Sequence, residues 1–118
     1  MRAFFYLKTC NTCIRIQKEL NLPEGIALRE LKSTPVSKPE LEVLKEISGT
    51  YESLFNRRSK LYTSMGLKHE DLKEKDYEHY ILDHYSFLKR PVLILDDNIF
   101  IGNSKKEIKR ALLHLNNL

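Results

Sequence analysis

Residues 3–20, AFFYLKTCNTCIRIQKEL, decide the fold of this chain. The stretch begins with an apolar, aromatic run over residues 4–7, of the kind that favours a β-strand. Two cysteines, Cys10 and Cys13, follow after a two-residue gap, and a helical pattern comes after them. The apolar members of that pattern are Ile14, Ile16 and Leu20. The stretch therefore predicts a strand, a sharp turn carrying two cysteines, and a helix.

The turn before the predicted helix suits an anion. The first turn of a helix has free N–H groups, and the helix dipole adds positive potential at the same place. A thiolate is such an anion, so we expect Cys10, just before the helix, to have a lowered pKa and to be the nucleophile. Cys13 lies one turn further on and is expected to attack a mixed disulfide at Cys10. The sequence thus predicts a redox-active dithiol.

Two other interpretations of the cysteine pair stay open. One is half of a zinc site, although structural zinc usually has four ligands and the chain holds no second cysteine pair. The other is an inert site in which Cys13 is a small core residue. The four histidines lack the spacing of a zinc finger: His69, His79, His84 and His114. We expect no metal site and no tightly bound cofactor.

Size and composition limit the classes of protein that fit. The chain has 118 residues, 42% of them hydrophobic and 31% charged, which suits one globular domain. No run approaches the ~20 apolar residues of a membrane span. Both cysteines belong to one motif, which favours a reducing, cytoplasmic location. The net charge is +4, but no Lys/Arg stripe interleaved with aromatic residues occurs, so direct nucleic-acid binding is not expected.

The rest of the chain predicts further strands around a helical segment. A second strand is expected over residues 26–31, parallel to the first. Helices are expected from Ser37 to Gly49, through residues 61–65 and over residues 76–84, with a helical turn near residues 67–72. Residues 92–95 and 99–101 predict an antiparallel hairpin, followed by a last helix. Two helices are expected to begin with capping boxes, at Ser37/Glu40 and at Ser104/Glu107.

This order of elements predicts the fold class. Strand–helix–strand, a helical insert and then strand–strand–helix fit a mixed four-stranded sheet flanked by helices. With Cys-x-x-Cys at the first strand–helix junction, the prediction is an α/β (α+β) thioredoxin-like fold. We expect one domain over residues 1–118, with the inserted helical block at about residues 37–88.

A proline before the third strand is the second candidate for the site. Thioredoxin-like folds carry a cis proline there, beside the active cysteine, so Pro91 is expected to be cis. Arg90 would then lie near Cys10 and supply positive charge to a thiolate, a glutathione carboxylate or an oxyanion. The alternative is a trans proline with a solvated arginine. Elsewhere, Arg57 to Lys60 is interpreted as a solvated basic face. Four aromatic residues are interpreted as packing of the helical block: Tyr77, Tyr80, Tyr85 and Phe87.

These features together resemble the arsenate reductase (ArsC)/Spx family of thioredoxin-like proteins across nearly the whole chain. The matching segments are Cys10–Cys13, Arg58-Ser59-Lys60 with Tyr62 and Gly66-Leu67, Arg90–Ile94, and Ile101-Gly102-Asn103 with Glu107-Ile108. The resemblance implies that Cys10 is the catalytic or redox thiol. It also implies that Arg90 lines the same site and that Arg58 matches the arginine of the family's Arg-Ser-Lys segment.

The function expected from the dithiol and the resemblance is that of a cytoplasmic thiol–disulfide oxidoreductase, a thiol-dependent reductase. Cys10 attacks and Cys13 resolves, and glutathione or another thiol, small or on a protein, is the expected reductant. The residues expected to bind the substrate or this thiol are Arg90, Pro91, Arg58, Thr12 and Asn11.

Two alternatives stay open. The first is a Spx-like redox-switched transcriptional regulator that binds the RNA polymerase α subunit. The second is a true arsenate reductase. The glutaredoxin-dependent members of that class hold the oxyanion with three arginines, and at the third position this chain has Gly102-Asn103-Ser104.

Overall fold

The computed structural model describes all residues, 1–118. They divide into two compact units, one of residues 1–34 with 90–118 and one of Pro35–Lys89. The second unit comprises the predicted helical insert, with bounds close to those expected. That the whole chain acts as a single domain stays a prediction. No helix combines the length and the apolar character that crossing a membrane requires.

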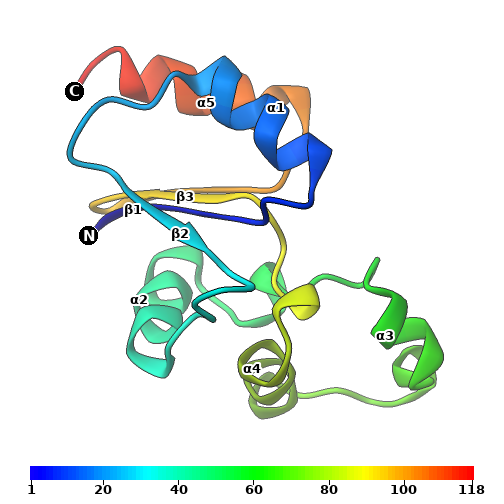
Figure 1. Cartoon of the computed structure of the whole chain (residues 1–118). Helices are drawn as coiled ribbons and strands as arrows, with labels where there is room; N and C mark the ends of the chain where they lie inside the picture. Colours follow the sequence, from blue (N-terminus) through cyan, green and yellow to red (C-terminus); the bar gives the residue numbers. More distant parts are fainter. The chain divides into compact units, whose positions relative to one another are not determined.

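The first unit is built on a four-stranded sheet (Figure 1). Its strands are β1 (Arg2–Tyr6), β2 (Ala27–Glu30), β3 (Val92–Leu95) and β4 (Asn98–Ile101). The strand order is β2-β1-β3-β4, with β1 parallel to β2 and antiparallel to β3, and β3 antiparallel to β4. This confirms the predicted mixed sheet of a thioredoxin-like fold.

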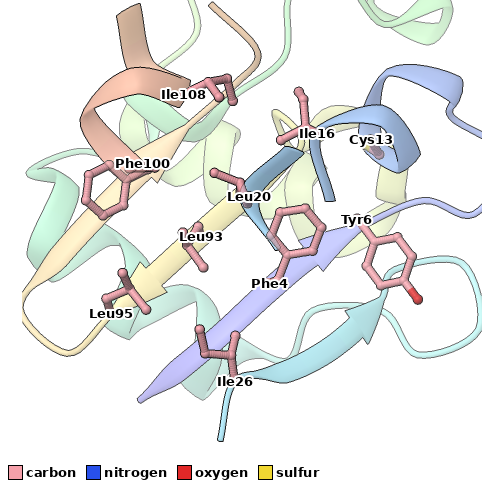
Figure 2. Close-up of a cluster of buried hydrophobic side chains, with 11 residues drawn as sticks. Phe4, Tyr6, Cys13, Ile16, Leu20, Ile26, Leu93, Leu95, Phe100 and Ile108 are labelled. Atoms are coloured by element: carbon pink, nitrogen blue, oxygen red, sulfur yellow. The ribbon is translucent and has the colours of Figure 1, made fainter. Parts of the chain in front are cut away.

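Two helices, α1 (Asn11–Leu20) and α5 (Lys105–Leu115), lie side by side over one face of this sheet (Figure 1). Their apolar stripes are buried against the strands, because residues three and four apart share a helix face. Figure 2 shows Cys13 among these core side chains. The buried cluster consists of Phe4, Tyr6, Cys13, Ile16, Leu20, Ile26, Leu93, Leu95, Phe100, Ile108 and Ala111.

The first helix begins earlier than its apolar pattern indicates. The pattern starts at Ile14, but α1 begins at Asn11, so Cys13 lies inside its first turn. The reason is that the Cys10 side chain caps the helix by accepting a hydrogen bond from the Cys13 N–H. At the other end Asn21 adopts a left-handed conformation, φ 48°, and its N–H donates to the Gln17 carbonyl.

The start of α5 differs from the predicted capping box. Ser104 caps the helix as expected, by accepting from the Glu107 N–H at 3.1 Å. The reciprocal bond is absent, because the Glu107 carboxylate accepts from the Ile101 N–H at 2.9 Å and from Arg110. Glu107 thus fastens the end of β4 to α5 rather than closing the box, and that half of the prediction was wrong.

The second unit is helical, with α2 (Lys38–Ser48), α3 (Lys60–Ser64) and α4 (Glu74–Asp83) joined by short 3-10 turns. The capping box of Ser37 and Glu40 at the start of α2 is confirmed. The unit packs around the buried ring of Phe55, whose centroid lies 4.9 Å from that of Tyr77 and 5.4 Å from that of Phe87. Of the four aromatic residues predicted to pack this block, Tyr77 and Phe87 are buried and the other two are half-buried.

Candidate dithiol site

Cys10 sits at the junction between β1 and α1. Its backbone is extended, with φ −95° and ψ 107°, and its N–H donates to the Leu7 carbonyl at 3.1 Å. Its Sγ accepts from the Cys13 N–H, with 3.4 Å between sulfur and nitrogen. The side chain is half-buried, so one side of the sulfur stays open to solvent. The predicted position of Cys10 just before the helix is confirmed, and its role as the nucleophile stays a prediction.

The surroundings of Cys10 favour its charged form. Partial burial raises the pKa of this thiol, but four lowering effects together outweigh the burial. These are the N–H and the thiol of Cys13, the positive charge of Arg90 and the N–H of Thr12. The net result is a pKa of Cys10 below its ordinary value, as expected for a thiolate at a helix N-terminus.

Cys13 has the opposite character. Its side chain is wholly buried, and burial is the main cause that raises its pKa to about 12. The hydrogen bond to Cys10 and the charge of Cys10 raise it further, while the Leu7 N–H and Arg90 oppose the shift. Both cysteines are free thiols. The pair therefore combines an outer sulfur that ionises more readily than an ordinary thiol with an inner, protonated sulfur that donates a hydrogen bond to it.

The peptide bond between Arg90 and Pro91 is cis, which confirms the prediction from the sequence. Pro91 is buried at the start of β3, beside the end of β1. Its carbonyl accepts from the Gly102 N–H at 2.9 Å. Arg90 is half-buried, and its charge lowers the pKa of both cysteines. Arg90 thus acts on the dithiol electrostatically, as expected.

Of the other predicted binding residues, Asn11, Thr12 and Arg58, only Thr12 has an interaction with a cysteine. Asn11 is exposed and Thr12 is half-buried in the first turn of α1, where the Thr12 N–H helps to lower the pKa of Cys10. Arg58 belongs to the second unit, where its side chain is exposed and its N–H donates to Asn56 at 3.0 Å. Binding of a substrate or thiol by these three residues stays a prediction.

Arg57, next to Arg58, is interpreted from the sequence as part of a solvated basic face, but its side chain makes contacts within the second unit. Its Nη2 lies 2.7 Å from the Glu52 carboxylate and 2.9 Å from the Tyr77 hydroxyl. Its guanidinium carbon also stands 5.5 Å from the centre of the Tyr77 ring. Arg57 therefore helps to hold the second unit together, although its side chain is exposed.

Glu30, at the end of β2, is a neighbour of the site that the sequence did not reveal. Its Oε2 accepts from the Lys8 N–H at 2.9 Å. Its Oε1 accepts from the Ser33 N–H at 2.7 Å and the Ser33 hydroxyl at 2.9 Å. No local pattern announces the bond to Lys8, because the two residues meet only through the pairing of β1 with β2. No group of three or more His, Cys, Asp or Glu side chains is arranged to hold a metal ion.

Comparison with known sequences places this chain among described relatives. The family model described as "ArsC family" matches residues 5–111. The global transcriptional regulator Spx of Bacillus subtilis is 24% identical over 114 residues, which cover 95% of this chain and 87% of that protein. The regulator Spx of Streptococcus mutans is 23% identical, with 95% of this chain and 83% of that protein covered.

Solved structures are similar over the same length. An ArsC-family-related protein from Bacteroides fragilis matches with a TM-score of 0.78 at 19% identity, covering 93% of this chain and 96% of that one. An arsenate reductase from Vibrio cholerae matches with a TM-score of 0.76 at 15% identity and 95% coverage of both chains. At these identities the similarity shows that the fold is shared.

Proposed function

The chain belongs to the ArsC family, and on that premise we propose that it is a thiol–disulfide oxidoreductase of the reducing cytoplasm. The proposal rests on one observation: a half-buried Cys10 with a lowered pKa, hydrogen-bonded to a buried Cys13 whose pKa is raised to about 12. Because the two thiols differ in burial and pKa, each has its own role in the proposed reaction. Cys10 is the attacking thiolate and Cys13 is the resolving thiol.

In the first step the Cys10 thiolate attacks one sulfur of a substrate disulfide. A bond forms between Cys10 Sγ and that sulfur, the substrate S–S bond breaks, and the other sulfur leaves as a thiolate that takes a proton from water. The positive charge of Arg90 favours the ionised form of Cys10 before the attack. The product is a mixed disulfide between Cys10 and half of the substrate.

In the second step Cys13 resolves this mixed disulfide. Two of the causes that keep Cys13 protonated, the hydrogen bond to Cys10 and the charge of Cys10, disappear once Cys10 is no longer a thiolate. Cys13 then loses its proton to solvent or to the leaving thiolate and attacks Cys10 Sγ, and the second half of the substrate leaves as a thiol. The substrate has gained two electrons, and the two cysteines have become a disulfide.

A second thiol must return those electrons. We propose glutathione or another small or protein thiol, two equivalents of which reduce the Cys10–Cys13 disulfide and are themselves oxidised to a disulfide. The charge of Arg90, the residue before the cis Pro91, acts on Cys10, which supports the proposal that an incoming thiol with a carboxylate meets a positive charge there. Asn11, Thr12 and Arg58 are the further candidate contacts for this thiol.

Single-turnover reduction of bis(2-hydroxyethyl) disulfide, without added thiol, tests the proposal. The reduced protein is expected to release two equivalents of mercaptoethanol and to become oxidised. Cys13→Ser is expected to release one equivalent and to retain the other as an adduct visible by mass spectrometry. Cys10→Ser is expected to release none while keeping its circular dichroism spectrum. Release by Cys10→Ser at the wild-type rate would rule the mechanism out.

A second candidate function is favoured by the relatives. Global transcriptional regulators named Spx match over 95% of this chain. A Spx-like role would use the same dithiol as a switch and would bind the C-terminal domain of the RNA polymerase α subunit. Co-purification of that domain with this protein, changed by oxidation of the cysteines and absent in Cys10→Ser when oxidised, supports the regulator. Turnover without any such binding supports the enzyme. Consumption of reductant that depends on arsenate would instead identify an arsenate reductase.

A further inference from the structure

The turn that precedes Cys10 touches both cysteines. The Leu7 carbonyl accepts from the Cys10 N–H at 3.1 Å, and the Leu7 N–H faces the Cys13 sulfur and lowers the pKa of that thiol. Lys8 and Thr9 complete the turn and are exposed. The position of this turn therefore sets where the Cys10 sulfur stands relative to the N–H groups of α1.

One side chain holds this turn from outside. Glu30 accepts from the Lys8 N–H through Oε2 and from Ser33 through Oε1. Its carboxylate thus ties the turn before Cys10 to the turn after β2, across 22 residues of chain. The N–H groups of Lys8 and Ser33 lower the pKa of Glu30 to about 2, so the carboxylate stays charged at any pH at which the dithiol works.

We infer that Glu30 is a positioning residue for the dithiol: it fixes the turn at Lys8 and thereby keeps Cys10 seated on the first turn of α1. The inference rests on the proposed thiol–disulfide function and goes beyond it, because it assigns a role to a residue outside the Cys-x-x-Cys and Arg-Pro motifs. The simpler alternative is that Glu30 only stabilises the turn formed with Ser33.

The two explanations, and a third based on charge, predict different effects on the thiol. If Glu30 positions the turn, its removal lets the Cys10 sulfur move relative to the first turn of α1 and weakens the N–H contacts that favour the thiolate. If Glu30 acts only as a nearby negative charge, its removal favours the thiolate instead, because a like charge has been taken away. If Glu30 serves only its own turn, the thiol is unchanged.

The experiment measures alkylation of Cys10 by iodoacetamide, a neutral reagent, across pH 5–10. In Glu30→Ala the rate at pH 6.5 is expected to fall about threefold or more, which corresponds to a rise in pKa of about half a unit. Glu24→Ala is the matched control, because it also removes one carboxylate, in this case from an exposed residue of the loop before β2. Ser33→Ala keeps the bond to Lys8. Both are expected to stay within about 1.5-fold of the wild-type rate.

A rate that is unchanged or higher in Glu30→Ala overturns the inference. If Glu30→Ala does not fold, Glu30→Gln keeps the shape and one carbonyl acceptor, and a smaller fall in the same direction is expected; an unchanged rate overturns the inference there too. The outcome is separate from that of the proposed function. If the pKa of Cys10 in the wild-type protein is that of a free thiol, ~8.5, the proposed function is contradicted. If that pKa is lowered but is the same in Glu30→Ala, only the positioning role of Glu30 is contradicted.

Discussion

At the scale of single residues, the two sulfur atoms of the dithiol differ because water reaches only one of them. Cys10 is half-buried and receives N–H groups and a positive charge, whereas Cys13 is sealed in the core with Phe4 and Ile16. An anion is stabilised by donors and cations and destabilised by burial, so the same chemical group acquires opposite tendencies three residues apart. The proposed order of attack rests on this difference and not on the mere presence of two cysteines.

Arg90 offers a direct test of that electrostatic account. In Arg90→Gln the positive charge near Cys10 is lost, so the pKa of Cys10 is expected to rise and its alkylation at pH 6.5 to slow about three- to tenfold. Arg15→Gln is the control, because Arg15 is an exposed residue of α1 paired with Glu19 at 3.6 Å. An equal effect of both substitutions would show that overall charge, not the place of Arg90, governs the thiol.

Much of the site could be predicted at this scale. The position of Cys10 at the start of a helix follows from a local pattern, and the cis bond before Pro91 was expected from the predicted thioredoxin-like fold. The complete burial of Cys13 could not be predicted in this way, because it depends on how α1 packs on β1. Glu30 was missed for the same reason, since its bond to Lys8 joins residues that only the sheet brings together.

At the scale of elements, the ends of α1 hold the site in place. The helix starts on the Cys10 sulfur and stops at Asn21, whose left-handed backbone returns the chain toward β2. An L-residue with a Cβ carries a cost in this conformation that asparagine tolerates and glycine does not have. The length of the helix is therefore set by two residues with unrelated chemistry.

Substitution of Asn21 tests whether its left-handed backbone conformation is what ends the helix. Asn21→Ala is expected to lower the free energy of unfolding by about 1 kcal/mol, and Asn21→Gly to leave it unchanged or raise it slightly. Urea denaturation measures both, with exposed Lys18→Ala on the same helix as the control, expected within about 0.5 kcal/mol of wild type. If the alanine and glycine variants were equally stable, the left-handed backbone would not be what ends the helix.

Most element types and their order were predictable, because capping residues and apolar spacing act locally. The start of α1 at Asn11, directly after Cys10, agrees with the prediction, and the Cys10 sulfur serves as its cap. The box at α5 stayed half-formed because the Glu107 carboxylate accepts from the Ile101 N–H and from Arg110 instead. Sequence periodicity carries no information about these two competing contacts.

At the scale of the whole molecule, three carboxyl groups of the first unit have a lowered pKa. Glu30 is lowered mainly by the Lys8 N–H, Asp96 by Arg2, and Glu107 by Arg110. A carboxyl whose folded pKa lies below its unfolded value stabilises the fold above the unfolded pKa and loses that contribution as the pH falls toward the folded pKa. These contributions are full near pH 5 and are lost progressively toward pH 2.

The first unit is therefore expected to lose part of its stability as the pH is lowered. Hydrogen exchange followed by mass spectrometry from pH 5 to pH 2.5, corrected for the intrinsic exchange rate, should show protection lost progressively in β1, β3 and α5. In the double variant Glu30→Gln with Glu107→Gln, the pH dependence of the first unit should flatten. Protection of β1, β3 and α5 that stays unchanged from pH 5 to pH 2.5 would contradict this expectation.

The sealed position of Cys13 also makes the oxidation state of this protein countable. A thiol-reactive tag applied to the native, reduced chain can attach only to the sulfur that solvent reaches, while the unfolded reduced chain accepts two tags and the unfolded oxidised chain none. After unfolding, reduced, mixed-disulfide and oxidised molecules therefore carry two, one and no tags, so their proportions can be read on a gel in a crude extract, without purification or a spectroscopic probe.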